Sequence, residues 1–381
     1  MVQLLVVTLA SLVLLAAAIE LASRIWLKIH RGYFVFSPGA RRLFHLDAEM
    51  LPQLPGTVNL HINSDGERGD EFVAAPDTFR VLIAGGSAAQ ALFTDQASTW
   101  HTVMKRELEK HDALRVLSAS RVHVGSIGLS GIHSKSVLLI LQRVLPRYRK
   151  LDAIVLMLGA GDPLRWVAGG APLEGVALQT TAECFDVHPE HDYGFALRSS
   201  ATLELARRLR ARLIIERRDR VGRWIGRARA QRNAPVELRE TITDPSRMIA
   251  AYERNTAEII ALARSKARYV LFARQPWYRK DDLTPEESAL FWNFGVETEK
   301  YGESSAFYSH AIADELLTRI DASSSRLARQ ARIGDLDVKA ALPPSPSNYY
   351  DQFHFTPEGN RIVGKMVAER LLELVSGDAQ N

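Results

Sequence analysis

A serine near the start of the chain and an aspartate and histidine near its end are the residues most suited to chemistry. Ser87 follows Gly85 and Gly86, directly after a short apolar run, and Asp351 and His354 lie three residues apart. A carboxylate that accepts a hydrogen bond from one imidazole nitrogen leaves the other nitrogen free to act as a base. Together the three residue types are the parts of a nucleophilic triad, here in the chain order Ser, Asp, His.

Each half of this set also has a structural interpretation. Ser87 could be the N-cap of a helix that begins after a Gly-rich turn. Asp351 and His354 would share a face on one helical turn, and an Asp-x-x-His pair alone is mostly structural. Thr356 and Pro357 then mark the start of a helix, with threonine as N-cap and proline at the first helical position. The catalytic interpretation therefore depends on the combination of the three residues.

Alternating strands and helices would position these residues at one edge of a sheet. Residues 80–84 form a short apolar run typical of a buried parallel strand. The expected strands are 80–84, 122–125, 151–158, 268–274 and 331–336, and the expected helices are 100–110, 134–144, 252–265 and 356–375. This order predicts an α/β fold, a three-layer α/β/α sandwich with a mostly parallel sheet of about five strands. Ligands bind at the carboxyl ends of such strands, where Ser87, Gly128 and residues 159–162 would lie.

Four blocks of sequence, in order, resemble the SGNH (GDSL-type) hydrolase superfamily and, within it, bacterial membrane-anchored members. The blocks are Asn63-Ser-Asp-Gly-Glu-Arg-Gly69, Gly85-Gly-Ser87, Ser126-Ile-Gly-Leu-Ser-Gly131 and Asp351-x-x-His354, in a resemblance that spans residues 63–374. It implies a serine esterase with Ser87 as nucleophile, His354 as general base and acid, and Asp351 as the residue that fixes the imidazole tautomer. It further implies that the N–H groups of Ser87 and Gly128 stabilise the oxyanion, and that no cofactor or metal is needed.

Counted from the block that holds Ser87, the third block of the family is altered in this chain. Family members usually carry Gly-x-Asn-Asp, whose asparagine amide is a further oxyanion donor, whereas this chain has Gly159-Ala-Gly161-Asp162. Gly161 then stands in place of the asparagine, and loss of one such donor typically lowers turnover by about 10²–10³-fold.

Two kinds of function remain open at this point. One is an esterase or O-acyl hydrolase that acts on an acylated glycan, an acyl lipid or a small ester, or an O-acyltransferase that shares the first half-reaction. The other is a catalytically impaired SGNH-fold binding or scaffold protein of an envelope or polysaccharide assembly. The complete Ser87, Asp351 and His354 set favours the first, and Gly161 favours the second.

The N-terminal residues predict a membrane anchor. Residues 2–19 are apolar without a charge, so we interpret residues 1–28 as a transmembrane helix. Residues 29–77 are interpreted as a linker and domain-edge segment, and residues 78–376 as the hydrolase domain. The family resemblance favours a single-pass protein of the inner membrane with an extracytoplasmic domain. The arginines that follow the apolar run favour a cytoplasmic domain instead.

An arginine-rich helical insert is predicted at about residues 163–245. Its segment 207–232 could be a basic amphipathic helix on an anionic membrane surface or a solvated helix packed on the domain. No nucleic-acid-binding module accompanies the charge, so we expect no nucleic-acid partner. His123 and His133 have no partner at metal-ligand spacing. Cys184 is the single cysteine, which excludes an intrachain disulfide and a multi-thiolate metal site.

Overall fold

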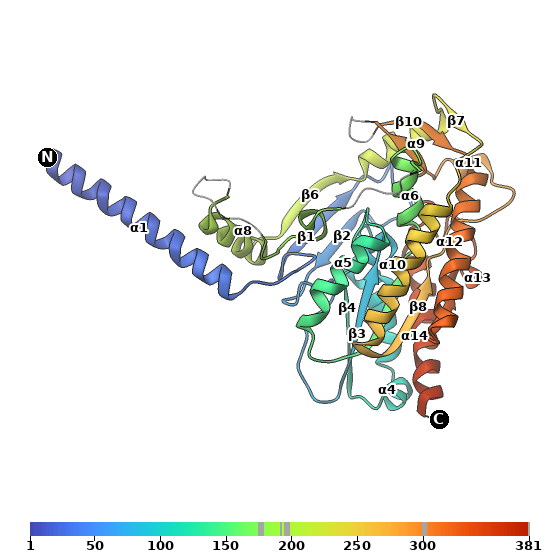
Figure 1. Ribbon diagram of the computed structural model, residues 1–381, viewed down its shortest axis with the longest axis horizontal. Helices are drawn as coiled ribbons and strands as arrows, with labels where there is room; N and C mark the ends of the chain where they lie inside the picture. Colours follow the sequence, from blue (N-terminus) through green and yellow to red (C-terminus); the bar gives the residue numbers. More distant parts are fainter. Residues whose placement is uncertain (174–178, 191–192, 194–198, 299–302, 380–381) are drawn as a thin grey trace.

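The centre of the protein is a sheet of five parallel strands in the order β11-β8-β5-β3-β4. The strands are β3 (Thr78–Gly85), β4 (Arg121–Ser126), β5 (Leu151–Met157), β8 (Ala267–Arg274) and β11 (Gly334–Asp337). The computed structural model describes residues 1–173, 179–190, 193, 199–298 and 303–379. The predicted five-stranded parallel sheet is confirmed (Figure 1).

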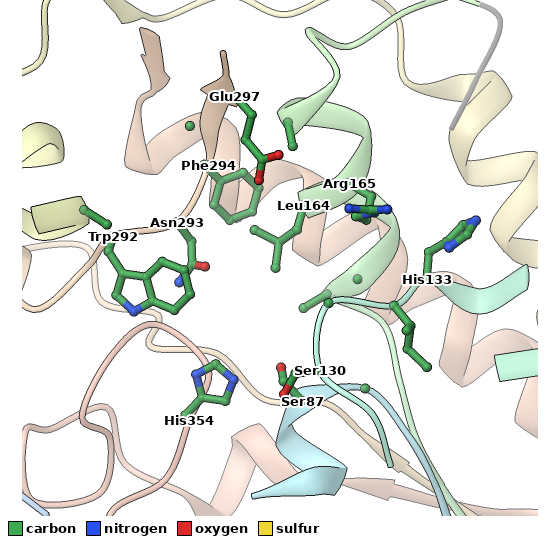
Figure 2. Close-up of a pocket in the computed structure, with 18 of the residues that line it drawn as sticks. Ser87, Ser130, His133, Leu164, Arg165, Trp292, Asn293, Phe294, Glu297 and His354 are labelled. Atoms are coloured by element: carbon green, nitrogen blue, oxygen red, sulfur yellow. The ribbon is translucent and has the colours of Figure 1, made fainter. Parts of the chain in front are cut away.

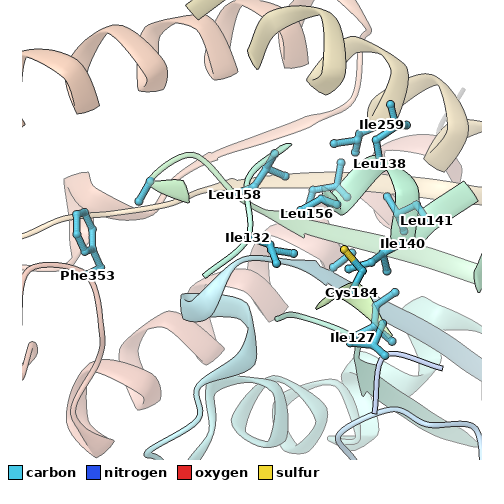
Figure 3. Packing of buried hydrophobic residues seen from close by; sticks show 14 of the residues in the cluster. Ile127, Ile132, Leu138, Ile140, Leu141, Leu156, Leu158, Cys184, Ile259 and Phe353 are labelled. Atoms are coloured by element: carbon cyan, nitrogen blue, oxygen red, sulfur yellow. The ribbon is translucent and has the colours of Figure 1, made fainter. Parts of the chain in front are cut away.

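Helices cover both faces of this sheet. One face carries α5 (Ser134–Val144), α10 (Ser246–Arg264) and α12 (His310–Gln330), and the other carries α3 (Trp100–Leu108), α4 (His111–Leu117) and α14 (Pro357–Ala379). Every residue of β3 is buried, because Leu82 and Ala84 pack into the first core and Val81 and Ile83 into the second. Figure 3 shows part of the first core, which Cys184 joins as a packed residue. The predicted three-layer α/β/α sandwich is therefore confirmed.

Two smaller sheets add to this core. β2 (Thr57–His61), β1 (Arg41–Leu46) and β6 (Glu216–Val221) form one, and β7 (Leu238–Arg239), β10 (Ser304–Tyr308) and β9 (Gly295–Glu297) form the other. The segment interpreted as a linker thus holds two strands, one of which pairs with a strand of the insert. The shorter helices are α2 (Ser87–Gln90), α6 (Gly161–Ala168), α7 (Thr181–Cys184), α11 (Pro285–Ser288) and α13 (Val338–Ala341), and the insert adds α8 (Ala201–Leu213) and α9 (Arg223–Asn233).

The first sequence block has a structural role. Arg68 is fully buried, and its guanidinium donates hydrogen bonds of 2.6 Å to the carbonyl oxygens of Gln90, Ala91 and Thr94. These carbonyls belong to the last residue of α2 and to the turn that follows it, so Arg68 fixes the chain shortly after Ser87. Glu67, one residue earlier, is buried against His123 at 2.8 Å, which gives that histidine a structural partner.

The N-terminal helix α1 (Val2–Ile29) projects away from the rest of the protein (Figure 1). It is long and apolar enough to cross a membrane, with a mean hydropathy of 2.6 over its most apolar stretch, and residues 2–19 are exposed. Its last turns pack on α8. There Glu20 accepts hydrogen bonds from the Ser200 hydroxyl at 2.6 Å and from the backbone N–H groups of Ala201 and Thr202 at 2.9 and 3.0 Å. The charge that interrupts the apolar run therefore caps the insert helix.

Candidate active site

Ser87 is the first residue of α2 and follows the carboxyl end of the central strand β3. The turn before it requires glycine, because a Cβ on Gly85 would lie 1.8 Å from the carbonyl oxygen of Met157. Within the described part of the chain, neither the Ser87 hydroxyl nor its backbone N–H is engaged by another residue. Both groups are thus available to a substrate.

Asp351 and His354 form a hydrogen-bonded pair. His354 Nδ1 lies 2.7 Å from Asp351 Oδ2 and 2.9 Å from Oδ1. Trp292 also holds the carboxylate, because its indole N–H donates to Oδ2 at 2.9 Å. The two residues do not share a helical turn as expected. They lie in a loop before α14, where Oδ1 accepts the backbone N–H groups of Phe353 and His354 at 2.9 Å each. An aspartate side chain that accepts these local N–H groups stabilises such a turn without helical backbone.

The environment of Asp351 keeps its carboxylate ionised. Burial alone would raise its pKa, since the residue is 0% exposed. The His354 imidazole and the two backbone N–H donors outweigh burial, and the pKa of Asp351 is lowered below its ordinary value. An ionised Asp351 holds the Nδ1–H tautomer of His354 and leaves Nε2 as the acceptor for a proton.

Ser87 and His354 line one cavity of about 670 Å³. Figure 2 shows both at the same end of it, with Trp292, Asn293 and Phe294 on the wall beside His354 and Arg165 and His133 on the opposite side. The structure thus brings the three predicted triad residues to one site at the carboxyl end of β3. No hydrogen bond joins Ser87 to His354 in the structure, and catalytic hydrogen bonds of this kind often form only when substrate binds.

The structure places Gly128 behind α2 and away from the cavity wall. Its N–H donates to Ser126 Oγ at 3.2 Å, and a Cβ at this position would lie 2.6 Å from the Ala89 carbonyl carbon. Of the same sequence block, Ser130 and Gly131 line the cavity instead. The backbone N–H of Gly128 is therefore occupied, whereas no described residue accepts from that of Ser87.

Gly161 lines the cavity at the start of α6, but no side chain fits there. A Cβ would lie 2.0 Å from the carbonyl oxygen of Ile132. The neighbouring Asp162 accepts hydrogen bonds from the backbone N–H and the hydroxyl of Ser134 at 2.8 and 2.6 Å, which caps α5. Burial raises the pKa of Asp162 to about 6. The altered third block therefore lets the start of α6 pack closely against the start of α5. It supplies no side-chain donor at position 161.

Helix α9 of the arginine-rich insert forms part of the cavity wall. Arg229 donates to the carbonyl oxygens of Leu290 at 3.0 Å and Tyr350 at 2.6 Å, and Arg232 donates to those of Asn293 at 2.9 Å and Tyr308 at 3.1 Å. Burial lowers the pKa of Arg232 to about 10. These two arginines hold the loops that carry Asp351 and Asn293, a role that neither sequence interpretation of the insert included. Part of the insert lies outside the described residues.

Several residues at the site carry no signal in the sequence. Trp292, Asn293 and Phe294 lie in a loop without periodic pattern or turn motif, and their role follows only from the fold. His133 lines the cavity with its Nδ1 3.1 Å from the Gln179 side-chain oxygen, and burial lowers its pKa. Among the described residues, no group of three or more His, Cys, Asp or Glu side chains could hold a metal ion.

Comparison with known proteins finds similarity at the level of structure. No family model matches the sequence, and no curated protein sequence matches it. The fold is similar to an acetylxylan esterase from Geobacillus stearothermophilus, with 11% identity, a TM-score of 0.39 and 77% of this chain and 94% of that chain covered. It is also similar to a member of the lipolytic G-D-S-L family from Veillonella parvula, with 10% identity, a TM-score of 0.40 and 76% of this chain and 97% of that chain covered. A third similar structure is a lipase/acylhydrolase from Enterococcus faecalis, with 12% identity, a TM-score of 0.39 and 78% of this chain and 96% of that chain covered. One of these three structures is thus a member of the lipolytic G-D-S-L family, and the other two are an esterase and a lipase/acylhydrolase.

Proposed function

We propose that the protein is a membrane-anchored serine ester hydrolase. The observation that carries this proposal is the Asp351–His354 pair, whose histidine lines the same cavity as Ser87. A nucleophile, a base and a residue that orients the base are the parts that acyl transfer requires.

In the proposed reaction, Ser87 Oγ attacks the carbonyl carbon of an ester while His354 Nε2 takes the hydroxyl proton. The backbone N–H of Ser87 supports the oxyanion. The bond between the carbonyl carbon and the alcohol oxygen then breaks, and His354 returns the proton to the departing alcohol. Water repeats the sequence on the acyl-enzyme, which releases the acid and restores Ser87. An acceptor alcohol in place of water would make the same site an O-acyltransferase.

Helix α1 anchors this site to the membrane in our proposal. Its exposed apolar residues 2–19 suit lipid, and Glu20 connects the anchor to α8 of the insert. We place the domain on the extracytoplasmic side of the inner membrane. A reporter fused after Asn381 that is active in only one compartment assigns the side.

Ester hydrolysis by the full chain in detergent micelles tests the proposal. We expect wild type to hydrolyse 4-nitrophenyl acetate above the rate of buffer and Ser87→Ala to lose that activity. Ser265→Ala is the matched control, because Ser265 lies at the exposed end of α10, where its hydroxyl donates to the Leu262 carbonyl. Equal rates for wild type and Ser87→Ala would favour the alternative, a binding or scaffold protein whose position 161 cannot hold an oxyanion side chain.

A further inference from the structure

The oxyanion of the proposed reaction needs more hydrogen-bond donors than the backbone N–H of Ser87. Sites that accelerate acyl transfer direct several donors at the oxygen on which charge develops. In this structure the N–H of Gly128 already donates to Ser126 Oγ at 3.2 Å, and Gly161 has no side chain. In the proposed reaction a further donor must therefore come from another residue that lines the cavity.

Gln275 follows strand β8 at the same sheet edge where Ser87 follows β3. Ala84 of β3, Leu156 of β5 and Phe272 of β8 form one row across three adjacent strands. Ser87 and Gln275 each come three residues after the member of that row in their own strand, shortly beyond its carboxyl end. Neighbouring strands are about 4.8 Å apart, so only the end of β5 separates the two residues.

The Gln275 amide lies over the end of β5, the strand between β8 and β3. Its Oε1 accepts a hydrogen bond from the backbone N–H of Ala160 at 3.4 Å. Gln275 is 8% exposed and lines the cavity, and within the described part of the chain no residue accepts from its Nε2. Because this nitrogen is not enclosed, unlike Nδ2 of Asn293, it can donate to a molecule in the cavity.

The backbone on both sides of Gln275 is held in place. The preceding Arg274 forms an ion pair with Asp321 at 2.6 Å. The following Pro276 restricts the backbone of Gln275 to extended conformations. A donor whose position is fixed before the reaction costs no reorganisation when charge develops on the substrate.

Ser130 lies next to Ser87 in the cavity (Figure 2), but its donors are already engaged. Its backbone N–H donates to Oε1 of Gln90 at 3.0 Å, and its hydroxyl donates to the same oxygen. Ser130 therefore offers no free donor to an oxyanion, whereas the amide nitrogen of Gln275 does.

We propose that Gln275 Nε2 is a catalytic donor that stabilises the oxyanion together with the backbone N–H of Ser87. This inference rests on the proposed function and adds a residue to its machinery. When Ser87 Oγ bonds to the carbonyl carbon, the π electrons of the C=O bond move to the oxygen, and the amide N–H donates to the resulting O⁻. The electrons return to the C=O bond as the alcohol oxygen leaves, so Gln275 neither gains nor loses a proton.

The test replaces Gln275 in the full chain in detergent micelles and follows hydrolysis of 4-nitrophenyl acetate. Gln275→Glu keeps the side-chain shape and Oε1, the acceptor for Ala160, but has an oxygen in place of Nε2. Gln275→Met removes the whole amide at similar length. We expect both variants to lower kcat by about 10²–10³-fold and to leave KM within about threefold, because an oxyanion donor acts on the transition state and not on the bound ester.

Gln330→Met is the matched control. Gln330 is exposed at the end of α12 and does not line the cavity, and its Oε1 also accepts a hydrogen bond, from Arg326 at 3.3 Å. This variant should leave kcat unchanged.

A folded Gln275→Glu or Gln275→Met whose kcat stays within about threefold of wild type would overturn the inference. A rise in KM with kcat unchanged would also overturn it, because that result marks a binding contact alone. In both cases loss of activity in Ser87→Ala would still support the proposed hydrolase. A wild-type protein that hydrolyses the ester no faster than buffer would contradict the proposed function and this inference with it.

Discussion

Asp351→Asn is expected to lower the rate of ester hydrolysis by about 10⁴-fold while the protein keeps its fold. Oδ1 of Asp351 accepts two backbone N–H groups, so in the variant the amide nitrogen must take the place of Oδ2. There it faces the indole N–H of Trp292 and Nδ1 of His354. An amide donates to Nδ1 and so selects the tautomer with the proton on Nε2, which cannot accept the proton of Ser87.

The measurement is kcat for 4-nitrophenyl acetate, accompanied by thermal unfolding to confirm the fold. Asp314→Asn is the matched control, because Asp314 Oδ1 also accepts an indole N–H, that of Trp277 at 2.8 Å, and Asp314 does not line the cavity. We expect the control to retain activity. A rate for Asp351→Asn within tenfold of wild type would mean that the carboxylate does not orient a catalytic base.

Gly161→Asn is expected to destabilise the protein by about 3 kcal/mol or more and to give no increase in activity. Sequence resemblance suggests the opposite, since the change would restore the asparagine of the family's third block. In this fold the new Cβ would lie 2.0 Å from the Ile132 carbonyl oxygen, and both backbone segments are packed beneath the cavity. The start of α6 or the segment before α5 would have to move, and with it the hydrogen bonds between Asp162 and Ser134.

Denaturant unfolding of wild type and Gly161→Asn measures the loss in the free energy of unfolding. Gly161→Ala should share it, because the clash arises at the Cβ itself. Gly56→Asn is the matched control, since a Cβ at Gly56 meets nothing within 4 Å, and its effect should stay within about 0.5 kcal/mol. If Gly161→Asn were as stable as wild type and more active, the backbone would accommodate the family's donor and the structural explanation for Gly161 would be wrong.

The central sheet could be predicted from sequence because its strands are buried on both faces. β3 and β5 are nearly continuous apolar runs, the pattern typical of parallel strands that are covered on both faces. β6 could not be predicted in this way. Its sequence, Glu-Arg-Arg-Asp-Arg-Val, is mostly exposed and charged, and it becomes a strand by pairing with β1. Helix α12 was not expected either, because Ser323, Ser324 and Ser325 interrupt the spacing of its apolar residues. In the structure these three serines are buried.

The candidate triad was identifiable from residue types and order, whereas its surroundings were not. Ser87, Asp351 and His354 belong to motifs with known chemical roles. Asn293 lies in a loop and Arg232 in the insert, two segments that are distant in sequence but meet beside the same cavity. No local pattern records such a meeting. The placement of Gly128 shows the same limit, because the direction of a backbone N–H depends on the neighbouring Ser126 side chain.

Labelling with a fluorophosphonate tests most directly whether the three residues form an activated nucleophile. Attack by Ser87 Oγ on phosphorus displaces fluoride and leaves a covalent adduct, so the natural ester need not be known. We predict that the folded full chain in detergent micelles is labelled on the peptide that contains Ser87. Ser87→Ala should carry no label, and His354→Ala should be labelled far more slowly. A folded wild-type protein that stays unlabelled, or equal labelling of wild type and Ser87→Ala, would contradict the assignment of Ser87 as the nucleophile.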